Sequence, residues 1–394
     1  MTAPFRFERL ARCSTTRART GRFHTPHGVV DTPAFMPVGT KATVKGLVPD
    51  QVRATGTQMV LANTYHLVLR PGTQLVRELG GLHRFMGWQG PILTDSGGYQ
   101  VFSLGHMTEI SEHGARLRSV VDGDWVELSP ESAIDAQRDL GADVIMAFDH
   151  CPADPLDRAS VEAATERTHR WLARCVARFD ATRAHGAPQA LFGIVQGGAF
   201  DDLRARSVDA LLAHDLVGHA IGGVSVGEHE QAIELAVDAA APRLPEEKPR
   251  YLMGVGTPRD FFRAVRAGVD MFDCVTPTRH GRNHQVWTST GRMNLRNSAW
   301  ARDERPLDAA CTCATCTQFS RAYLRHLCNC GEMLAGVLLS LHNVHFFQTL
   351  MARMRAAIAG GTFAALEDEC VVTLQAKTAG GSSGGPSSEP NEAP

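Results

Sequence analysis

The sequence contains little lysine, no long apolar run and almost no net charge. Of its 40 basic residues, 36 are arginine, and they stand against 42 acidic residues for a net charge of −2. This balance excludes a protein that holds nucleic acid by bulk positive charge, but it allows a local arginine-rich patch. No apolar run approaches the roughly 20 residues of a membrane span. Residues 1–13 lack the apolar core of a signal peptide, so we expect a cytoplasmic protein.

Eight short apolar segments recur along the 394-residue chain, and most of them are continuously apolar. Such segments are typical of strands that are buried on both faces. They cover residues 34–39, 58–66, 91–98, 143–150, 190–198, 219–227, 250–257 and 270–276. Between many of them lie amphipathic segments with apolar residues three and four apart, which predict helices. The alternation predicts an α/β fold, the (β/α)8 or TIM barrel.

Two segments interrupt this alternation. Residues 119–130 predict a small hairpin after the third strand, and residues 277–341 predict a zinc-binding insertion after the eighth. Residues 342–360 then predict the eighth barrel helix. We therefore expect one catalytic barrel domain over residues 1–376, followed by a disordered tail over residues 377–394, whose composition cannot form a core.

The insertion contains a cysteine cluster. Because disulfides are rare in cytoplasmic proteins, five cysteines between Cys311 and Cys330 point to a metal. Three thiolates from Cys311, Cys313 and Cys316 with one imidazole would make a closed, structural zinc site with one Zn2+ per subunit. We expect His342, placed at a helix end, to be the fourth ligand. Four other residues compete for this role on spacing alone: His326, Cys328, Cys330 and His345.

Three aspartates lie at the ends of predicted strands: Asp95, Asp149 and Asp273. In a barrel these ends line the C-terminal face, where active sites are built. Paired carboxylates there suit glycosidic-bond chemistry, in which one attacks or stabilises the anomeric carbon and one moves protons. Each aspartate taken alone can equally be the N-cap of the next helix. Their occurrence at three different strand ends favours the chemical interpretation.

The glycine-rich segments 193–198 and 221–227 allow two interpretations. They let a planar ligand approach the backbone, or they are ordinary tight turns. Gln196 beside the first turn has an amide that is able to read the edge of a base. Arg279 and Arg282, in the arginine-rich insertion, are expected either to contact a phosphate backbone or to lie on a solvated surface.

The chain resembles the tRNA-guanine transglycosylase family, also called queuine tRNA-ribosyltransferases. Its length is similar to that of the bacterial members, without appended RNA-binding domains. The resemblance spans roughly residues 20–375 and rests on the segments TDSGGYQVFSL (94–104), LSPESAIDAQRDLGADVIMAFDHC (128–151), FGIVQGG (192–198), IGGVSVGE (221–228), YLMGVGTP (251–258), DMFDCVTPTRHGRN (270–283), CTCATC (311–316) and LHNVHFF (341–347).

The resemblance implies a base exchange. Guanine at the wobble position of the tRNAs for Asp, Asn, His and Tyr is replaced by the queuosine precursor 7-aminomethyl-7-deazaguanine (preQ1), or by queuine in eukaryotes. It implies tRNA anticodon loops as partners, a homodimer, no membrane and no redox cofactor. Asp273 resembles the nucleophile that forms a covalent bond to ribose, and Asp95 resembles the general acid/base.

The resemblance also assigns binding residues. Asp149 resembles the carboxylate that reads the base, Gln196 and the Gly223 amide resemble donors to its carbonyl, and Tyr99 and Met253 resemble the pair that stacks on it. The implied base-binding set is Tyr99, Asp149, Cys151, Gln196, Gly222, Gly223, Val224 and Met253. The implied RNA-binding set is Lys45, Asn63, Gln100, Arg279 and Arg282.

Four positions refine the resemblance. Cys151 and Val226 are similar to the small-to-medium residues of bacterial members, which favours preQ1 over queuine. His150 replaces an expected glutamate, and His284 replaces an expected glycine.

Alternative functions are a queuine-using enzyme of the same family, a barrel glycosidase or nucleoside hydrolase, and a catalytically inactive tRNA-binding subunit. The zinc insertion argues against a hydrolase of small substrates. The three aspartates argue against an inactive subunit.

Overall fold

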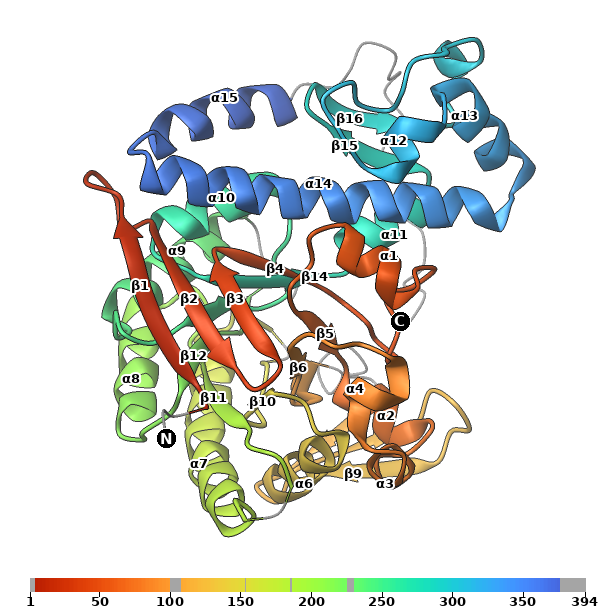
Figure 1. Ribbon diagram of the computed structural model, residues 1–394. Helices are drawn as coiled ribbons and strands as arrows, with labels where there is room; N and C mark the ends of the chain where they lie inside the picture. The colour runs from red at the N-terminus through yellow and green to blue at the C-terminus, as the bar shows by residue number, and fades with distance from the viewer. Residues whose placement is uncertain (1–3, 100–107, 153, 185, 225–229, 376–394) are drawn as a thin grey trace.

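The chain in this computed structural model is described over residues 4–99, 108–152, 154–184, 186–224 and 230–375. An eight-stranded parallel sheet lies at its centre, in the strand order β4-β14-β13-β12-β11-β10-β6-β5. The edge strands β4 and β5 meet through a parallel bridge between Val38 and Leu61, and the amide of Gly39 donates to the carbonyl of Leu61 at 2.6 Å. The sheet therefore closes, and the predicted TIM barrel is confirmed (Figure 1).

The barrel strands are β4 (Ala34–Pro37), β5 (Val60–Ala62), β6 (Ile92–Thr94), β10 (Val144–Met146), β11 (Ala190–Val195), β12 (Gly218–Ile221), β13 (Arg250–Leu252) and β14 (Met271–Cys274). Each predicted apolar segment contains one of them, although β12 begins one residue early. Successive side chains of a strand point to opposite faces. In β14, Met271 lies in the interior cluster and Phe272 in the outer one, so the alternation turns Asp273 inward.

Helices cover the outside of the barrel. They are α1 (Pro49–Ala54), α2 (Thr64–Leu69), α3 (Thr73–Glu78), α4 (Gly81–Met86), α6 (Pro130–Leu140), α7 (Arg158–Ala181), α8 (Asp201–Leu212), α9 (Glu230–Ala240), η2 (Ala241–Arg243) and α10 (Pro258–Arg266). The side chains of Ser129, Asp157 and Thr257 accept from backbone amides in the first turns of α6, α7 and α10. Such N-caps fix where these helices begin.

Two small antiparallel sheets flank the barrel. The first consists of β1 (Arg6–Arg12), β2 (Arg19–Thr25) and β3 (Gly28–Thr32) and was not predicted. Its Phe23 packs against Phe192 of the barrel interior, with 5.9 Å between the ring centroids. The second comprises β7 (Thr108–Ile110), β8 (Ala115–Arg118) and β9 (Trp125–Leu128). The predicted hairpin at 119–130 thus contains the turn and β9 but starts after β8.

The segment after β14 forms a subdomain and then returns to the barrel. Its elements are α11 (Thr276–Arg282), β15 (Gln285–Thr288), β16 (Gly291–Asn294), η3 (Ser298–Trp300), α12 (Ala314–Gln318), α13 (Arg321–Cys330), α14 (Met333–Ala359) and α15 (Phe363–Gln375). Helix α14 is 27 residues long and runs from this subdomain across the barrel (Figure 1). It begins at Met333, so the expected boundary at 341/342 lies inside one continuous helix. The expected tail, 377–394, is outside the described residues.

None of the helices in the described ranges has a segment both long and apolar enough to cross a membrane.

Candidate active site and metal centre

Asp95 lies directly after β6, where both of its carboxylate oxygens are held. The Asn63 side-chain amide donates to Oδ2 at 2.6 Å and the Thr64 backbone amide donates to Oδ1 at 2.7 Å. Burial raises the pKa of Asp95 to about 6, these hydrogen bonds oppose the rise, and the charges of Asp273 and Asp149 add to it. A carboxyl group with this pKa exchanges a proton readily near neutral pH.

Asp149 follows β10 and is buried. Its Oδ1 accepts from the Ser96 hydroxyl at 2.9 Å, and its Oδ2 accepts from the Gln196 amide at 2.7 Å. Burial raises its pKa, against these hydrogen bonds. A Cβ at Gly98 would overlap Asp149 Oδ1, so only glycine fits beside this carboxylate. The Oε1 of Gln196 is buried and has no hydrogen-bond partner among the described residues.

Asp273, in β14, is held at one oxygen only. Its Oδ1 accepts from the Tyr251 hydroxyl at 2.6 Å and from the Gly254 amide at 2.8 Å. Its Oδ2 accepts no hydrogen bond from the described residues. Burial raises the pKa of Asp273, and the two donors oppose that rise. The arrangement fixes the carboxylate and leaves one oxygen able to attack. Tyr251 was not singled out from the sequence, since a tyrosine in a buried strand is ordinarily a packing residue.

The turns after β11 and β12 are pinned by Arg204, which is fully buried. Its guanidinium donates to the carbonyls of Val195 at 3.0 Å, Gly198 at 2.7 Å and Gly222 at 2.7 Å. A Cβ at Gly223 would overlap Gln196 Oε1. Gly223 is therefore required by close packing against Gln196, and Gly222 by close packing against Ile194. Sequence analysis missed Arg204, although its four- and seven-residue spacing from Val208 and Leu211 places it on the buried face of α8.

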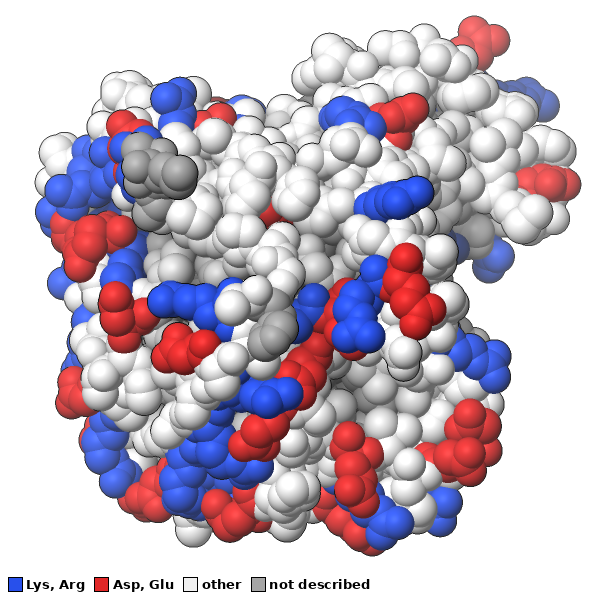
Figure 2. All heavy atoms as spheres, turned by 60° about the horizontal axis from the view of Figure 1, so that its bottom comes forward, with Lys and Arg blue, Asp and Glu red and all other residues white. Residues whose placement is uncertain are grey.

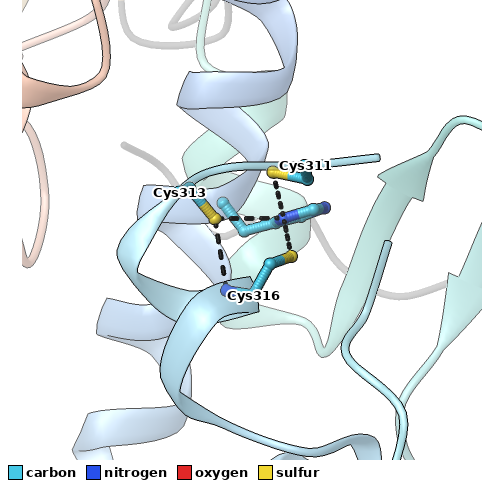
Figure 3. A group of neighbouring side chains, drawn as sticks. Cys311, Cys313 and Cys316 are labelled. Carbon is cyan, nitrogen blue, oxygen red and sulfur yellow. Dashed lines mark hydrogen bonds between the residues drawn. The ribbon is translucent and has the colours of Figure 1, made fainter. Parts of the chain in front are cut away.

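The four residues predicted to bind zinc, Cys311, Cys313, Cys316 and His342, are brought together in one cluster that could hold a metal ion. The Sγ atoms of Cys311, Cys313 and Cys316 lie 3.7, 3.5 and 3.3 Å from His342 Nδ1. Tetrahedral zinc with bonds of about 2.3 Å to sulfur and about 2.0 Å to nitrogen separates these atoms by about 3.5 Å, so the residues fit zinc. His342 Nε2 lies 2.7 Å from the Trp287 carbonyl, which leaves Nδ1 free to bind metal. Figure 3 shows the three sulfurs directed toward one another.

The competing fourth ligands are elsewhere. His345 Nε2 lies 3.4 Å from the Thr312 hydroxyl, and His326 faces Cys330 at 3.6 Å. Cys328 is buried but is not part of the four-residue cluster. His342 lies in the middle of α14 and not at a helix end, because α14 begins nine residues earlier than expected.

Comparisons with known proteins agree with this geometry. A family-wide sequence profile described as "Queuine tRNA-ribosyltransferase" matches residues 13–376. The chain belongs to the queuine tRNA-ribosyltransferase family. A relative of that name from a Cyanothece species is 55% identical over 355 residues, 90% of this chain and 92% of the relative. A relative of the same name from a Nostoc species is 53% identical over 363 residues, which cover 92% of this chain and 96% of the relative. A relative from Thermus thermophilus is 53% identical over 361 residues, which cover 91% of this chain and 92% of the relative.

The other base-binding residues expected from the family lie at or just after the C-terminal ends of the barrel strands, as the three aspartates do. Val224 and Cys151 are buried, Met253 is half-buried after β13, and Tyr99 is 48% exposed after β6. Burial raises the pKa of Tyr99, with smaller effects from the charges of Cys151, Arg279 and Asp273.

Of the residues expected to bind RNA, only Arg279 and Arg282 share one element, and the others belong to different segments. Arg279 and Arg282 are exposed on α11, directly after β14, and neither forms an ion pair with the described residues. Lys45 is exposed on another loop. Asn63 holds Asp95, and Gln100 lies outside the described residues. Basic and acidic side chains are intermixed on the face drawn in Figure 2, in keeping with the small net charge.

Two departures from the family pattern have a structural setting. His284 has a φ of 61°, a left-handed conformation that glycine adopts without strain, which explains why glycine is expected there. His150 Nδ1 lies 3.2 Å from the Arg167 guanidinium, and burial lowers the pKa of His150 to about 4. A glutamate there would instead carry a negative charge toward Arg167.

Proposed function

We propose that this protein is a tRNA-guanine transglycosylase. It replaces guanine at the wobble position of the tRNAs for Asp, Asn, His and Tyr by preQ1, through a covalent bond between Asp273 and the ribose. The observation that carries this proposal is the unequal engagement of the buried carboxylates. Within the described residues, Asp273 has one oxygen held by Tyr251 and Gly254 and one oxygen without a donor, whereas both oxygens of Asp95 and of Asp149 are held.

In the first half of the reaction, Oδ2 of Asp273 attacks C1′ of the ribose. The bond from C1′ to N9 of guanine breaks, its electron pair goes to the base, and Asp95 supplies the proton that makes the base a neutral leaving group. The transition state carries oxocarbenium-like positive charge, which the Asp273 carboxylate stabilises before it forms the bond. The pKa of about 6 leaves a fraction of Asp95 protonated near neutral pH.

The second half reverses these roles. Ionised Asp95 accepts the N9 proton of preQ1, N9 attacks C1′, and the bond from C1′ to Asp273 breaks. Neither half consumes ATP or moves electrons to a cofactor. Water must be kept away from the covalent intermediate, since hydrolysis would leave an abasic tRNA.

The base is read by hydrogen bonds and stacking. Asp149 accepts from the amino group and ring N–H of guanine, Gln196 and the Gly223 amide donate to its carbonyl, and Tyr99 and Met253 stack on its faces. The Val224 carbonyl accepts from the aminomethyl group of preQ1, and Gly222 and Cys151 complete the slot. Because Gln196 now donates to Asp149, the base must replace this contact when it binds.

The remaining assignments complete the proposal. Zinc, one ion per subunit, holds the subdomain of Cys311–Cys316 against α14 through His342. Lys45, Asn63, Gln100, Arg279 and Arg282 contact the anticodon loop. The catalytic domain covers residues 1–376, and the enzyme works as a cytoplasmic homodimer.

Exchange with radiolabelled guanine tests the proposal. Unmodified tRNA of the four types should take up label at the wobble position, and excess preQ1 should block further uptake. A nucleoside hydrolase would instead release guanine and leave abasic tRNA without uptake. That result would overturn the proposal, as would uptake by tRNAs of other specificities at equal rates.

A further inference from the structure

A second group of metal-binding side chains lies far from the cysteine cluster, at the N-terminal end of the barrel. His27 is in the turn between β2 and β3, His83 is on α4, and Asp143 directly precedes β10. Their ligand atoms all lie within 4.8 Å of one another. In Figure 1 the turn between β2 and β3 lies beside β10. Neither the family resemblance nor the proposed reaction uses these residues.

Asp143 is a rigid ligand. Its side chain is fully buried, its backbone amide donates to the Ile92 carbonyl at 2.9 Å, and its carbonyl accepts from Ala190 at 2.8 Å. The Ile92 amide also donates to Asp143 Oδ2 at 2.9 Å. Although burial opposes it, hydrogen bonds from His83, His27 and Ile92 hold the pKa of Asp143 below its usual value. The carboxylate is therefore ionised at neutral pH, as a metal ligand must be.

In the described part of the chain, His27 and His83 are the only residues whose side chains form hydrogen bonds with the buried carboxylate of Asp143. His27 Nδ1 lies 2.8 Å from Oδ1 and His83 Nε2 lies 3.0 Å from Oδ2. The side chain of His83 is 13% exposed and that of His27 is 37% exposed, so the group opens to solvent on the His27 side. A fixed carboxylate, two imidazoles and an open side are typical of sites for divalent transition metals.

We propose that His27 Nδ1, His83 Nε2 and the Asp143 carboxylate bind a divalent transition-metal ion such as zinc or cobalt, with water in the remaining positions. Each imidazole would bind the ion in its neutral form with its proton on the other ring nitrogen, so no proton would lie between the imidazoles and the carboxylate. The hydrogen bond from Ile92 orients the carboxylate from behind. Bound metal would link the β2–β3 turn to the base of the barrel.

Metal binding requires one movement. The two rings are stacked, with centroids 3.6 Å apart and planes 16° from parallel. A metal–imidazole bond of about 2.0 Å lies in the plane of the ring, so two stacked rings cannot both direct a lone pair at one ion. His27 is the ring that must tilt outward, because it is in an exposed turn whereas His83 is on a helix and mostly buried.

The test uses full-length protein whose cysteine site is already filled with one equivalent of zinc. Cobalt is then added and unbound metal is removed by gel filtration. Wild type should retain a second metal equivalent with weak d–d absorption and no thiolate charge-transfer band. His27→Asn and His83→Gln place an amide nitrogen where Nδ1 and Nε2 lie, so they keep a donor to Asp143 and remove the imidazole ligand. Both variants should lose the second equivalent.

His24→Asn is the matched control, because His24 is a partly exposed histidine of the adjacent strand that faces Glu8 instead. It should retain the second equivalent. Cobalt should also raise the melting temperature of wild type and His24→Asn but not of the two ligand variants. If His83→Gln proves unstable, His27→Asn decides alone. Retention of only one equivalent by wild type, thiolate absorption from the added cobalt, or two equivalents in His27→Asn would overturn the site.

Discussion

The two ends of strand β14 hold buried aspartates that differ in their partners. Asp270, before the strand, forms a two-point ion pair with the Arg19 guanidinium at 3.0 and 2.6 Å and accepts from the Arg250 amide. Asp273, at the other end, accepts only from neutral donors in the described part of the chain, Tyr251 and Gly254. Burial alone therefore does not mark a reactive carboxylate. Asp273 differs from Asp270 in two ways among the described residues: burial without a cation raises the pKa of Asp273, and its Oδ2 accepts no hydrogen bond.

The largest expected difference between Asp270 and Asp273 is in the unfolding free energy that is lost when each is replaced by asparagine. Asp270→Asn leaves Arg19 buried without its counter-charge and should cost about 3–5 kcal/mol of unfolding free energy. Asp273→Asn removes a carboxylate whose burial is unfavourable and should leave stability unchanged or higher. Urea denaturation at pH 7.5 measures both. Equal losses in the two variants would break the comparison.

The raised pKa of Asp95 should make the stability of the protein depend on pH. Its folded-state pKa of about 6 lies above the ordinary value of 3.8, so the folded protein binds this proton more tightly than the unfolded chain. The stability of wild type relative to Asp95→Asn should therefore fall as pH rises from about 4 to about 6 and then level off, by on the order of 3 kcal/mol.

The rate of guanine release should also depend on the protonation of Asp95. Guanine release needs protonated Asp95, so the single-turnover release rate should decline as pH rises through about 6. Rapid-quench assays across pH 5–8 measure this. A rate that stays flat across this range would mean that Asp95 does not supply the proton.

Of these four predictions, Tyr251→Phe should give the smallest effect. It removes one of the two donors that fix Asp273 Oδ1 but leaves the Gly254 amide in place. We expect kcat to fall by about 10–100-fold with little change in KM for tRNA, because Tyr251 orients the nucleophile and does not bind RNA. A change confined to KM would contradict this positioning role.

Much of the fold and part of the site were predictable from the sequence. The eight barrel strands are continuously apolar because both faces are buried, and Asp95, Asp149 and Asp273 follow from where those strands end. The small sheet of β1–β3 was missed because β1 has no buried residue and no alternating pattern. The early start of α14 was missed because residues 333–341 were assigned to the insertion, although this stretch is apolar and contains neither arginine nor cysteine.

The contacts that tune the site could not be predicted. Tyr251 contacts Asp273 only because β13 and β14 are neighbours in the barrel. Arg204 reaches two turns from a helix, a geometry that the spacing of α8 indicates but does not specify. His27, His83 and Asp143 form no sequence motif, because they are brought together from a turn, a helix and a strand start. The cysteine cluster was predictable, since three of its ligands occur within six residues.

The most direct test of the account is the identity of the residue that carries the ribose. Wild-type protein is incubated with tRNA while released guanine is removed, denatured, and digested for peptide mass spectrometry. We predict a ribose-linked adduct on the peptide containing Asp273, and no adduct in Asp273→Asn although that variant still folds and binds tRNA. An adduct on Asp95 or Asp149, or one that persists in Asp273→Asn, would contradict the account.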